Sequence, residues 1–194
     1  MQSCWSCFFA KRLGFCTFTK KVFMKKIYLL TFLLITTLSF SQTAEEKEAK
    51  KKLADAEKAA LPKPYHEMED ADTKVKELLV QAKAENKNIL IQVGGNWCIW
   101  CLRLNDFIQK SDELKGIINA NYLFYHLNYS PKNKNEKFFS QYGNPGEKHG
   151  YPVFMILDSN GKLLHVQESG SLEEGKGYSL ERVKGFLNSW LAKS

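Results

Sequence analysis

Two cysteines three positions apart, Cys98 and Cys101, follow a short apolar segment and constrain the fold more than any other feature. The segment, residues 89–93, reads Ile-Leu-Ile-Gln-Val, which is typical of a strand buried on both faces of a sheet. Residues 94–97, Gly-Gly-Asn-Trp, form a turn, and apolar residues then recur at helical spacing. A strand, a turn and a helix that begins at the cysteine pair predict an α/β fold.

The position of the pair at a helix N-terminus predicts redox chemistry. Free backbone N–H groups and the helix dipole favour negative charge there, so the Cys98 sulfur is stabilised as a thiolate, its nucleophilic form. The helix brings Cys101 round to the same side, where it can attack a mixed disulfide formed at Cys98. We therefore expect Cys98 to be the exposed attacking residue and Cys101 the shielded resolving residue.

Three other interpretations of the cysteines are weaker. A structural zinc site needs four ligands with paired spacing. The four histidines are instead scattered along the chain: His66, His126, His149 and His165. A purely structural disulfide is disfavoured because so small a ring constrains the unfolded chain little. A second Cys-x-x-Cys, at Cys4 and Cys7, follows no strand and lies upstream of a predicted export signal, so we interpret it as coincidence.

Hydrophobic periodicity and turn residues divide the rest of the chain into helices and strands. The predicted helices are residues 72–85, from 98, 111–119, 136–142 and from 179, with N-caps at Asp72, Ser111 and Ser179. The predicted strands are residues 89–93, 122–127, 152–157 and 162–168, the last two joined by a turn at 158–161. The strand–helix–strand unit gives parallel strands and the hairpin adds antiparallel ones, so we expect a small mixed sheet between helices.

Residues 1–41 are predicted to be an export signal. Two lysines, Lys25 and Lys26, precede an apolar run over 27–38, and the small residues that follow suit cleavage before position 42. A bilayer span needs about 20 apolar residues, so cleavage is favoured over a retained membrane anchor. A complete signal begins at Met24, and we hypothesise that translation starts there and that residues 1–23 are a mis-assigned start.

Residues 42–64 are predicted to form a charged helical spacer, and residues 65–194 the folded domain. The spacer is rich in Ala, Glu and Lys, and Pro62 and Pro64 end it. The formal net charge of +7 comes mainly from residues 1–41, which hold six of the 28 basic residues and none of the 21 acidic ones. Since the remainder is nearly neutral, we infer no nucleic-acid partner.

Residues 89–101 resemble the strand and Trp-Cys-x-x-Cys segment of the thioredoxin superfamily, and residues 150–154 resemble its cis-proline loop and following strand. The resemblance covers about residues 72–192. Within the superfamily, the chain is similar above all to bacterial envelope proteins that have a signal peptide and a Trp-Cys-x-x-Cys motif. It implies a thioredoxin-like three-layer sandwich, a central mixed sheet flanked by helices. It also implies that the Tyr151–Pro152 bond is cis, lies beside the sulfurs and leaves the Tyr151 backbone free to pair with an extended substrate. Spacing alone also fits Pro152 as the first residue of a strand.

Two departures from thioredoxins bear on the reaction. In thioredoxins an aspartate six positions before the first cysteine assists proton transfer to the resolving thiol, whereas this chain has Gln92, which cannot titrate. The residues between the cysteines are Ile99 and Trp100, which bring no positive charge to a thiolate. Because neither side chain stabilises a thiolate, the dipeptide favours a reductase or isomerase-like role over a strong oxidant.

Residues around the motif are expected to shape the site. Trp97 and Trp100 are predicted to form an apolar collar, although Trp97 suits packing equally well. His149 is expected at the surface, with an approach to the first sulfur as the alternative. Arg103 is expected to face solvent. The connection over residues 130–150 is longer than usual and either shapes partner choice or is a surface insertion.

Together these features predict an extracytoplasmic thiol–disulfide oxidoreductase, periplasmic or secreted, that acts on protein thiols or disulfides. The residues expected to contact substrate are Trp97, Trp100, Tyr151 and Pro152. We expect no metal or organic cofactor, membrane contact only through an uncleaved signal, and recycling by an envelope electron donor or acceptor. The alternatives are a disulfide-donating oxidase and a non-catalytic thioredoxin-fold binding module of the envelope.

Overall fold

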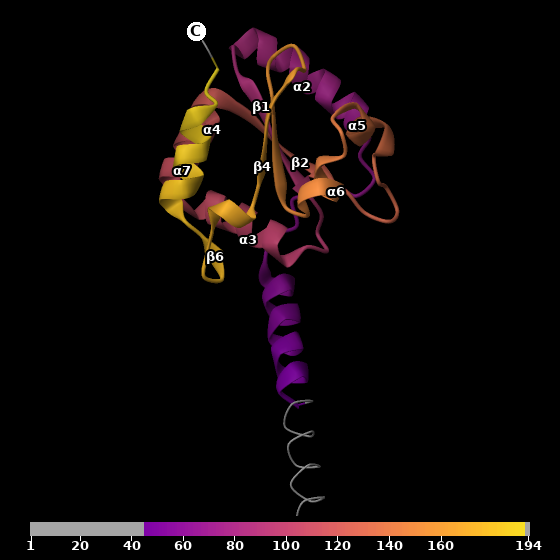
Figure 1. Ribbon diagram of the computed structural model, residues 1–194, viewed down its shortest axis with the longest axis vertical. Coiled ribbons are helices and arrows are strands. Elements are labelled where there is room, and N and C mark those ends of the chain that lie inside the picture. The colour runs from indigo at the N-terminus through magenta and orange to yellow at the C-terminus, as the bar shows by residue number, and fades with distance from the viewer. Residues whose placement is uncertain (1–44, 193–194) are drawn as a thin grey trace, which may run out of the picture. The chain divides into compact units, whose positions relative to one another are not determined.

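The computed structural model describes residues 45–192 (Figure 1). The predicted export signal and the proposed start at Met24 lie outside these residues. The chain divides into two units, Met1–Asp55 and Ala56–Ser194. Residues 45–60 are helical, and the sheet lies in the second unit. None of the helices within the described part of the chain is long and apolar enough to cross a membrane.

The second unit alternates helices and strands in the predicted order. Its helices are α2 (Ala71–Glu85), α3 (Ile99–Lys110), α4 (Asp112–Asn121), α5 (Glu136–Gln141), α6 (Pro145–His149), the short 3₁₀ helix η1 (Gly170–Leu172) and α7 (Leu180–Ser189). Its strands are β1 (Asn88–Gly94), β2 (Tyr122–Asn128), β3 (Val153–Leu157), β4 (Leu163–Glu168), β5 (Glu173–Glu174) and β6 (Gly177–Tyr178). The sequence did not indicate α6, η1 or the small β5–β6 pair, because none of them has a long periodic pattern.

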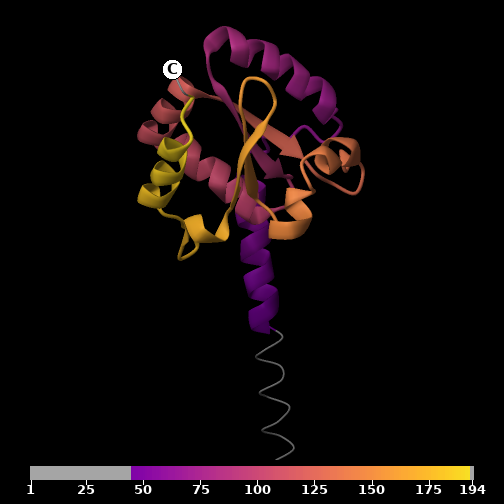
Figure 2. The ribbon, with the colours of Figure 1, turned by 45° about the horizontal axis from the view of Figure 1, so that its top comes forward.

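Four of the strands form one mixed sheet in the order β2-β1-β3-β4. Strand β1 runs parallel to β2 and antiparallel to β3, which in turn pairs antiparallel with β4. Figure 2 shows α2 on one side of these strands and the pair α4 and α7 on the other. The predicted α/β three-layer sandwich with a central mixed sheet is thus confirmed.

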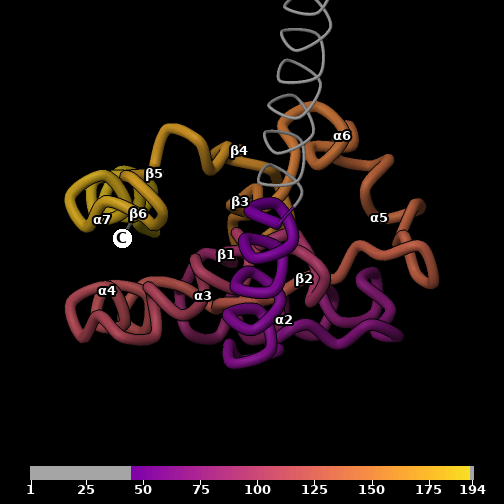
Figure 3. Tube along the Cα trace, turned by 90° about the horizontal axis from the view of Figure 1, so that it is seen from below, coloured from indigo at the N-terminus to yellow at the C-terminus, as the bar shows by residue number. Residues whose placement is uncertain are grey.

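The central strand β1 buries both of its faces, since every residue from Asn88 to Gly94 is buried. Ile89 and Ile91 pack into the cluster formed with α2 and α5. Leu90 packs on the opposite face with α3, α4 and α7, where α4 and α7 contact each other (Figure 3). This two-sided burial explains the apolar run in the sequence. It also makes Gln92, at the centre of the strand, the polar exception.

The element boundaries differ from the predicted ones at a few residues. Asp70 rather than Asp72 caps α2, and its side chain accepts a hydrogen bond from the Thr73 N–H at 2.8 Å. Aspartate suits both an N-cap and a first turn, so the sequence does not distinguish the two positions. Ser111 caps α4 as predicted, whereas Ser179 occupies the N-cap position of α7 without a side-chain capping bond.

Candidate active site

Helix α3 begins at the cysteine pair, as predicted. Cys98 is its N-cap residue with extended backbone (φ −93°, ψ 108°), and the Cys98 Sγ accepts a hydrogen bond from the Cys101 N–H at 3.2 Å. The Cys98 N–H donates to Gly95 O at 3.0 Å, which closes the turn that leads out of β1. The first sulfur therefore lies at the free N–H groups of a helix N-terminus, where negative charge is stabilised.

Cys98 and Cys101 are joined by a disulfide, and their α-carbons are 5.2 Å apart. The exposed fraction is 7% for Cys98 and 0% for Cys101. The order of exposure agrees with the prediction, but Cys98 is far less open than expected, because Leu61, Trp100 and Tyr151 pack around the pair. Of the two residues in this disulfide, only Cys98 retains any exposed surface.

The Tyr151–Pro152 bond is cis and lies beside the disulfide, as the resemblance implied. Cys98 Sγ is 3.7 Å from Tyr151 O. The pairing of β3 with its neighbours begins only at Val153, because Pro152 has no N–H to donate to the ladder. The backbone of Tyr151 thus lies outside the sheet ladder and next to the first sulfur, where an extended chain could pair with it.

An exposed aromatic rim borders the Cys98 side of the disulfide. Trp97 is 46% exposed, and its Nε1–H donates to Tyr129 O at 2.7 Å. The Trp97 ring meets the Tyr151 ring edge-on, with centroids 5.6 Å apart. The Tyr151 ring in turn stacks on Tyr129 at 5.0 Å. The rim on this side is therefore built from Trp97, Tyr129 and Tyr151. Tyr129 was not anticipated because it follows a strand end with no motif around it.

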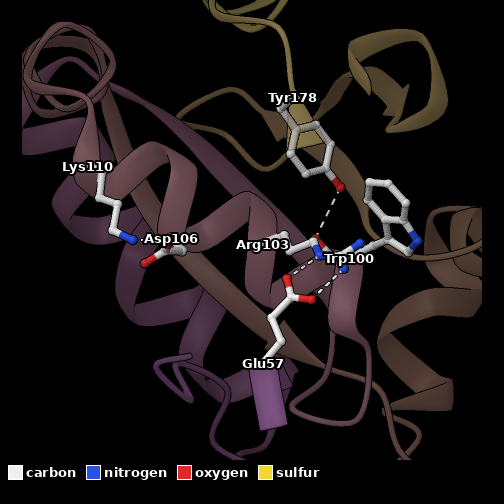
Figure 4. A network of polar contacts seen from close by, with 6 residues as sticks. All are labelled: Glu57, Trp100, Arg103, Asp106, Lys110 and Tyr178. Atoms are coloured by element: carbon white, nitrogen blue, oxygen red, sulfur yellow. Dashed lines mark hydrogen bonds and ion pairs between the residues drawn. The ribbon is translucent and has the colours of Figure 1, made fainter. Parts of the chain in front are cut away.

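The second predicted collar residue, Trp100, has different neighbours from Trp97 (Figure 4). The Tyr178 hydroxyl donates to Trp100 O at 3.1 Å, and the two rings meet edge-on. The Arg103 guanidinium lies 4.8 Å from the centre of the Trp100 ring, within the range of a cation–π contact. Trp100 is half-buried and packs against both the cysteine pair and Tyr178, so the two tryptophans border the disulfide with different neighbours, and their contact with a substrate stays a prediction.

Arg103 was expected to face solvent, but its side chain is paired with Glu57. The Arg103 guanidinium donates two hydrogen bonds to the Glu57 carboxylate, at 2.6 Å from Nε and 2.7 Å from Nη2 (Figure 4). This bidentate pairing lowers the pKa of the Glu57 carboxyl below its usual value. Glu57 lies within the stretch interpreted as a spacer, and a single acidic residue among many there gave no signal of this contact.

Cys101 lies above a buried polar group on the sheet. Gln92 is fully buried, and its Nε2 donates to Cys101 O at 2.9 Å and to the Tyr65 hydroxyl at 2.7 Å. Its Oε1 has no hydrogen-bond partner among the described residues. Tyr65 is 3% exposed, and burial raises the pKa of its hydroxyl. The sequence analysis placed the domain start near Tyr65 but assigned it no role, although an aromatic residue directly after two prolines was a usable signal.

None of the histidines forms a hydrogen bond to either cysteine within the part of the chain that the structure describes. His149 is exposed at the end of α6. His126, on β2, is paired in register with Gln92, and burial lowers its pKa from 6.5 to about 4. Its ring meets the Tyr65 ring edge-on at 5.4 Å. The surface position expected for His149 is therefore the one observed.

The long connection over residues 130–150 forms α5 and α6 and borders a hollow beside the cis-proline loop. The hollow has a volume of about 250 Å³. Aromatic rings and charged side chains both line it, among them Tyr129, Phe139, Tyr151, Lys134 and Glu147. Tyr151 therefore lies between this hollow on one side and the disulfide on the other.

Three comparisons bear on this site. Residues 75–175, just over half of the chain, match the thioredoxin-like domain family. The disulfide bond reductase DsbH of Chlamydia pneumoniae is 29% identical over 97 residues, which are 45% of this chain and 56% of that protein, so the chain spans little more than half of this relative's length. The crystal structure of a disulphide isomerase from Xylella fastidiosa Temecula1 superimposes with a TM-score of 0.58 at 26% identity, over 67% of this chain and 98% of that one.

Proposed function

The chain belongs to the thioredoxin-like domain family, and from this premise we propose that it is an extracytoplasmic thiol–disulfide oxidoreductase that acts on protein disulfides. The observation that carries the proposal is the Cys98–Cys101 disulfide at the N-terminus of α3, beside the cis Tyr151–Pro152 bond. The names of two similar proteins, a disulfide bond reductase and a disulphide isomerase, support the same chemistry.

The reaction follows from the different access to the two sulfurs. In the reduced protein the Cys98 thiolate attacks a substrate disulfide, one substrate sulfur leaves as a thiolate, and a mixed disulfide forms at Cys98. The Cys101 thiolate then attacks Cys98 Sγ and displaces the second substrate sulfur. Two electrons pass to the substrate, which takes up two protons as it leaves as two thiols. Tyr151 presents its backbone to the substrate chain, with Pro152 shaping the loop and the aromatic rim offering apolar contact.

The reductase or isomerase-like direction is part of the proposal. The Ile99-Trp100 dipeptide places no cationic side chain between the cysteines, so within the motif the helix N-terminus provides the stabilisation of the thiolate. An envelope electron donor would return the disulfide to the dithiol, and the sulfurs carry the electrons without a metal or organic cofactor. Location outside the cytoplasm rests on the export signal predicted at residues 1–41.

Insulin reduction by a small thiol tests the proposed activity. Wild type should accelerate insulin reduction. With Cys98→Ser the rate should fall to the uncatalysed value, because the attacking sulfur is gone. Cys101→Ser should accumulate mixed disulfides with its substrates, which can be separated on non-reducing gels and identified. Equal activity in wild type and Cys98→Ser would instead favour a non-catalytic binding module. Equilibration with a glutathione series tests the direction, since a strongly oxidising potential would favour the oxidase.

A further inference from the structure

The second sulfur of the pair must carry a negative charge at a place that water does not reach. Cys101 is fully buried in the disulfide. When that bond opens by attack on Cys98, its electron pair remains on Cys101 Sγ. A buried thiolate without a hydrogen-bond partner is strongly disfavoured. Gln92, which contacts the Cys101 carbonyl, carries no titratable proton for this sulfur.

Most titratable groups near the pair are engaged with other partners. Arg103 on α3 is paired with Glu57, and the Tyr178 hydroxyl on β6 donates to the backbone of the Cys-x-x-Cys segment. Burial lowers the pKa of His126, on β2, to about 4, so this ring is neutral near pH 7. The Tyr151 ring is held in the aromatic rim. Among the residues that the structure describes, none of these four groups forms a hydrogen bond to the second sulfur.

The Tyr65 hydroxyl, in contrast, shares a confined space with Cys101 Sγ. A β-carbon placed on Gly94 would lie 2.5 Å from Cys101 Sγ and 2.9 Å from the Tyr65 Oη. The two atoms are therefore separated by no more than the sum of these distances. Cys101 Sγ and Tyr65 Oη thus lie on the same side of Gly94 in β1, and their residues belong to one buried cluster. Glycine is required at this position because any side chain would occupy the space they share.

The hydrogen bonds of Gln92 determine where the Tyr65 hydroxyl hydrogen can go. The Cys101 carbonyl only accepts, so the Gln92 amide nitrogen, rather than its oxygen, must face it. The same nitrogen donates its second hydrogen to Tyr65 Oη at 2.7 Å. The hydroxyl is thus an acceptor toward Gln92 and keeps its own hydrogen for another partner. Within residues 45–192 no acceptor is bonded to this hydrogen, and Cys101 Sγ borders the same space over Gly94 as the hydroxyl.

The Tyr65 side chain is also held in place from its own backbone. Its N–H donates to Asn96 Oδ1 at 3.3 Å, and Asn96 Nδ2 donates to its carbonyl at 2.8 Å. Asn96 belongs to the turn that leads directly into Cys98. This two-way clamp ties the segment before α2 to the redox turn, so the hydroxyl is positioned before the disulfide opens.

We propose that Tyr65 is a catalytic residue whose O–H donates a hydrogen bond to the Cys101 thiolate. When a thiolate attacks Cys98 Sγ, the bond between the two cysteine sulfurs breaks and its electron pair stays on Cys101 Sγ, facing the Tyr65 hydroxyl. In the opposite direction the same thiolate attacks the mixed disulfide, and the substrate sulfur leaves with the electron pair. Tyr65 retains its proton throughout. This inference deepens the proposed oxidoreductase function and rests on it.

The pKa of Cys101 tests the inference in the full chain carrying Cys98→Ser. Thiolate absorbance in the ultraviolet is followed against pH, and subtraction of the Cys98→Ser, Cys101→Ser double variant removes the signal of the N-terminal cysteines. Adding Tyr65→Phe should raise the Cys101 pKa by about one unit or more, the effect of losing one hydrogen bond to a charge. Replacing Tyr65 by 3-fluorotyrosine keeps the hydroxyl and makes it more acidic. This replacement should lower the Cys101 pKa, because a more acidic hydroxyl is a stronger hydrogen-bond donor.

The rate of disulfide opening gives a second, independent measurement. Dithiothreitol should open the Cys98–Cys101 disulfide about threefold more slowly in Tyr65→Phe, because Cys101 becomes a poorer leaving group and the rate depends only fractionally on its pKa. Tyr122→Phe is the matched control. Tyr122 is equally buried, and its hydroxyl donates to Leu187 O at 2.6 Å, away from the cysteines. This control should leave both the Cys101 pKa and the opening rate unchanged.

The outcomes separate this inference from the proposed function. Wild-type values of the Cys101 pKa and opening rate in Tyr65→Phe would overturn the role of Tyr65, while Cys98-dependent insulin reduction in the same preparations would leave the oxidoreductase function intact. A shift of equal size in Tyr122→Phe would also overturn it, because the effect would then reflect packing. Insulin reduction that does not depend on Cys98 would sink the proposed function itself.

Discussion

The two sulfurs of this protein lie three residues apart, yet their surroundings differ in almost every respect. Cys98 borders an aromatic rim in which Trp97 is nearly half exposed, and its sulfur lies 3.2 Å from the Cys101 backbone nitrogen and 3.7 Å from Tyr151 O. Cys101 is fully buried, its carbonyl accepts a hydrogen bond from Gln92, and its sulfur shares the space over Gly94 with the Tyr65 hydroxyl. One sulfur is placed for access and the other for isolation from water.

This difference arises from distant segments rather than from the Cys-x-x-Cys spacing. The open side is completed by Tyr129 and Tyr151, which flank the long connection between β2 and β3. The closed side is completed by Tyr65, which precedes α2, and by Gln92 and His126 on neighbouring strands. A helix turn can present two sulfurs to each other, but only the surrounding chain decides which one meets a partner. Changes on the closed side should therefore affect stability and pH response, and changes on the open side should affect substrate binding.

The largest expected effect on the closed side is acid destabilisation through His126. Burial lowers its pKa from 6.5 to about 4, so between these values the unfolded chain binds a proton that the folded chain does not. Its stabilising contribution is complete above pH 6.5 and falls as the pH drops toward 4. At 1.36 kcal/mol per pKa unit, the free energy of unfolding should decline by about 3 kcal/mol over this window.

The variant His126→Phe isolates this contribution from that of the carboxylates. His126 Nε2 has no hydrogen-bond partner among the described residues. Phenylalanine therefore keeps the ring contacts, and the free energy of unfolding at neutral pH should change little. Urea unfolding of both proteins at a series of pH values measures the difference in the free energy of unfolding, which should grow in favour of His126→Phe as the pH falls from 6.5 toward 4. Parallel curves for the two proteins would show that His126 is not the group responsible.

A somewhat smaller effect is expected from Gly94→Ala. The added β-carbon would approach Cys101 Sγ to 2.5 Å and the Tyr65 hydroxyl to 2.9 Å, so one of them must move. Overpacking of this kind lowers the free energy of unfolding by about 1–3 kcal/mol. Gly116→Ala is the matched control, because a β-carbon there meets no atom within 4 Å and alanine favours the helix. Equal stability of the two variants in thermal unfolding would mean that the closed side is not tightly packed.

The smallest effect on stability is expected on the open side, from Trp97→Ala. The side chain is 46% exposed and donates one hydrogen bond, so the free energy of unfolding should fall by about 1 kcal/mol or less. Loss of the rim contact should raise the KM for a peptide disulfide severalfold with little change in kcat. Val80→Ala removes an exposed apolar group from α2, away from the disulfide, and should leave KM unaltered. An unchanged KM in Trp97→Ala would remove the rim from the substrate-binding surface.

Much of the fold was predictable because its signals are local. The apolar run of β1, the turn at Gly95 and the helix after Cys98 each follow from residues within a few positions of one another. The long connection between β2 and β3 was also recognised. The N-cap of α2 was misplaced by two residues because Asp70 and Asp72 both suit a helix start. What separates them is where the backbone bends, which neighbouring elements decide.

The features of the candidate site also separate into those that neighbouring residues in the chain produce and those that distant residues produce. The sequence by itself determined the reactive pair, its place at a helix N-terminus and the polar exception at Gln92, because chain neighbours produce all three. Only the tertiary structure decided that Tyr65 lies over Cys101, that Tyr129 completes the rim and that Arg103 is paired with Glu57. These contacts join residues far apart in the chain. No local pattern encodes them, because packing of the whole domain brings the side chains together.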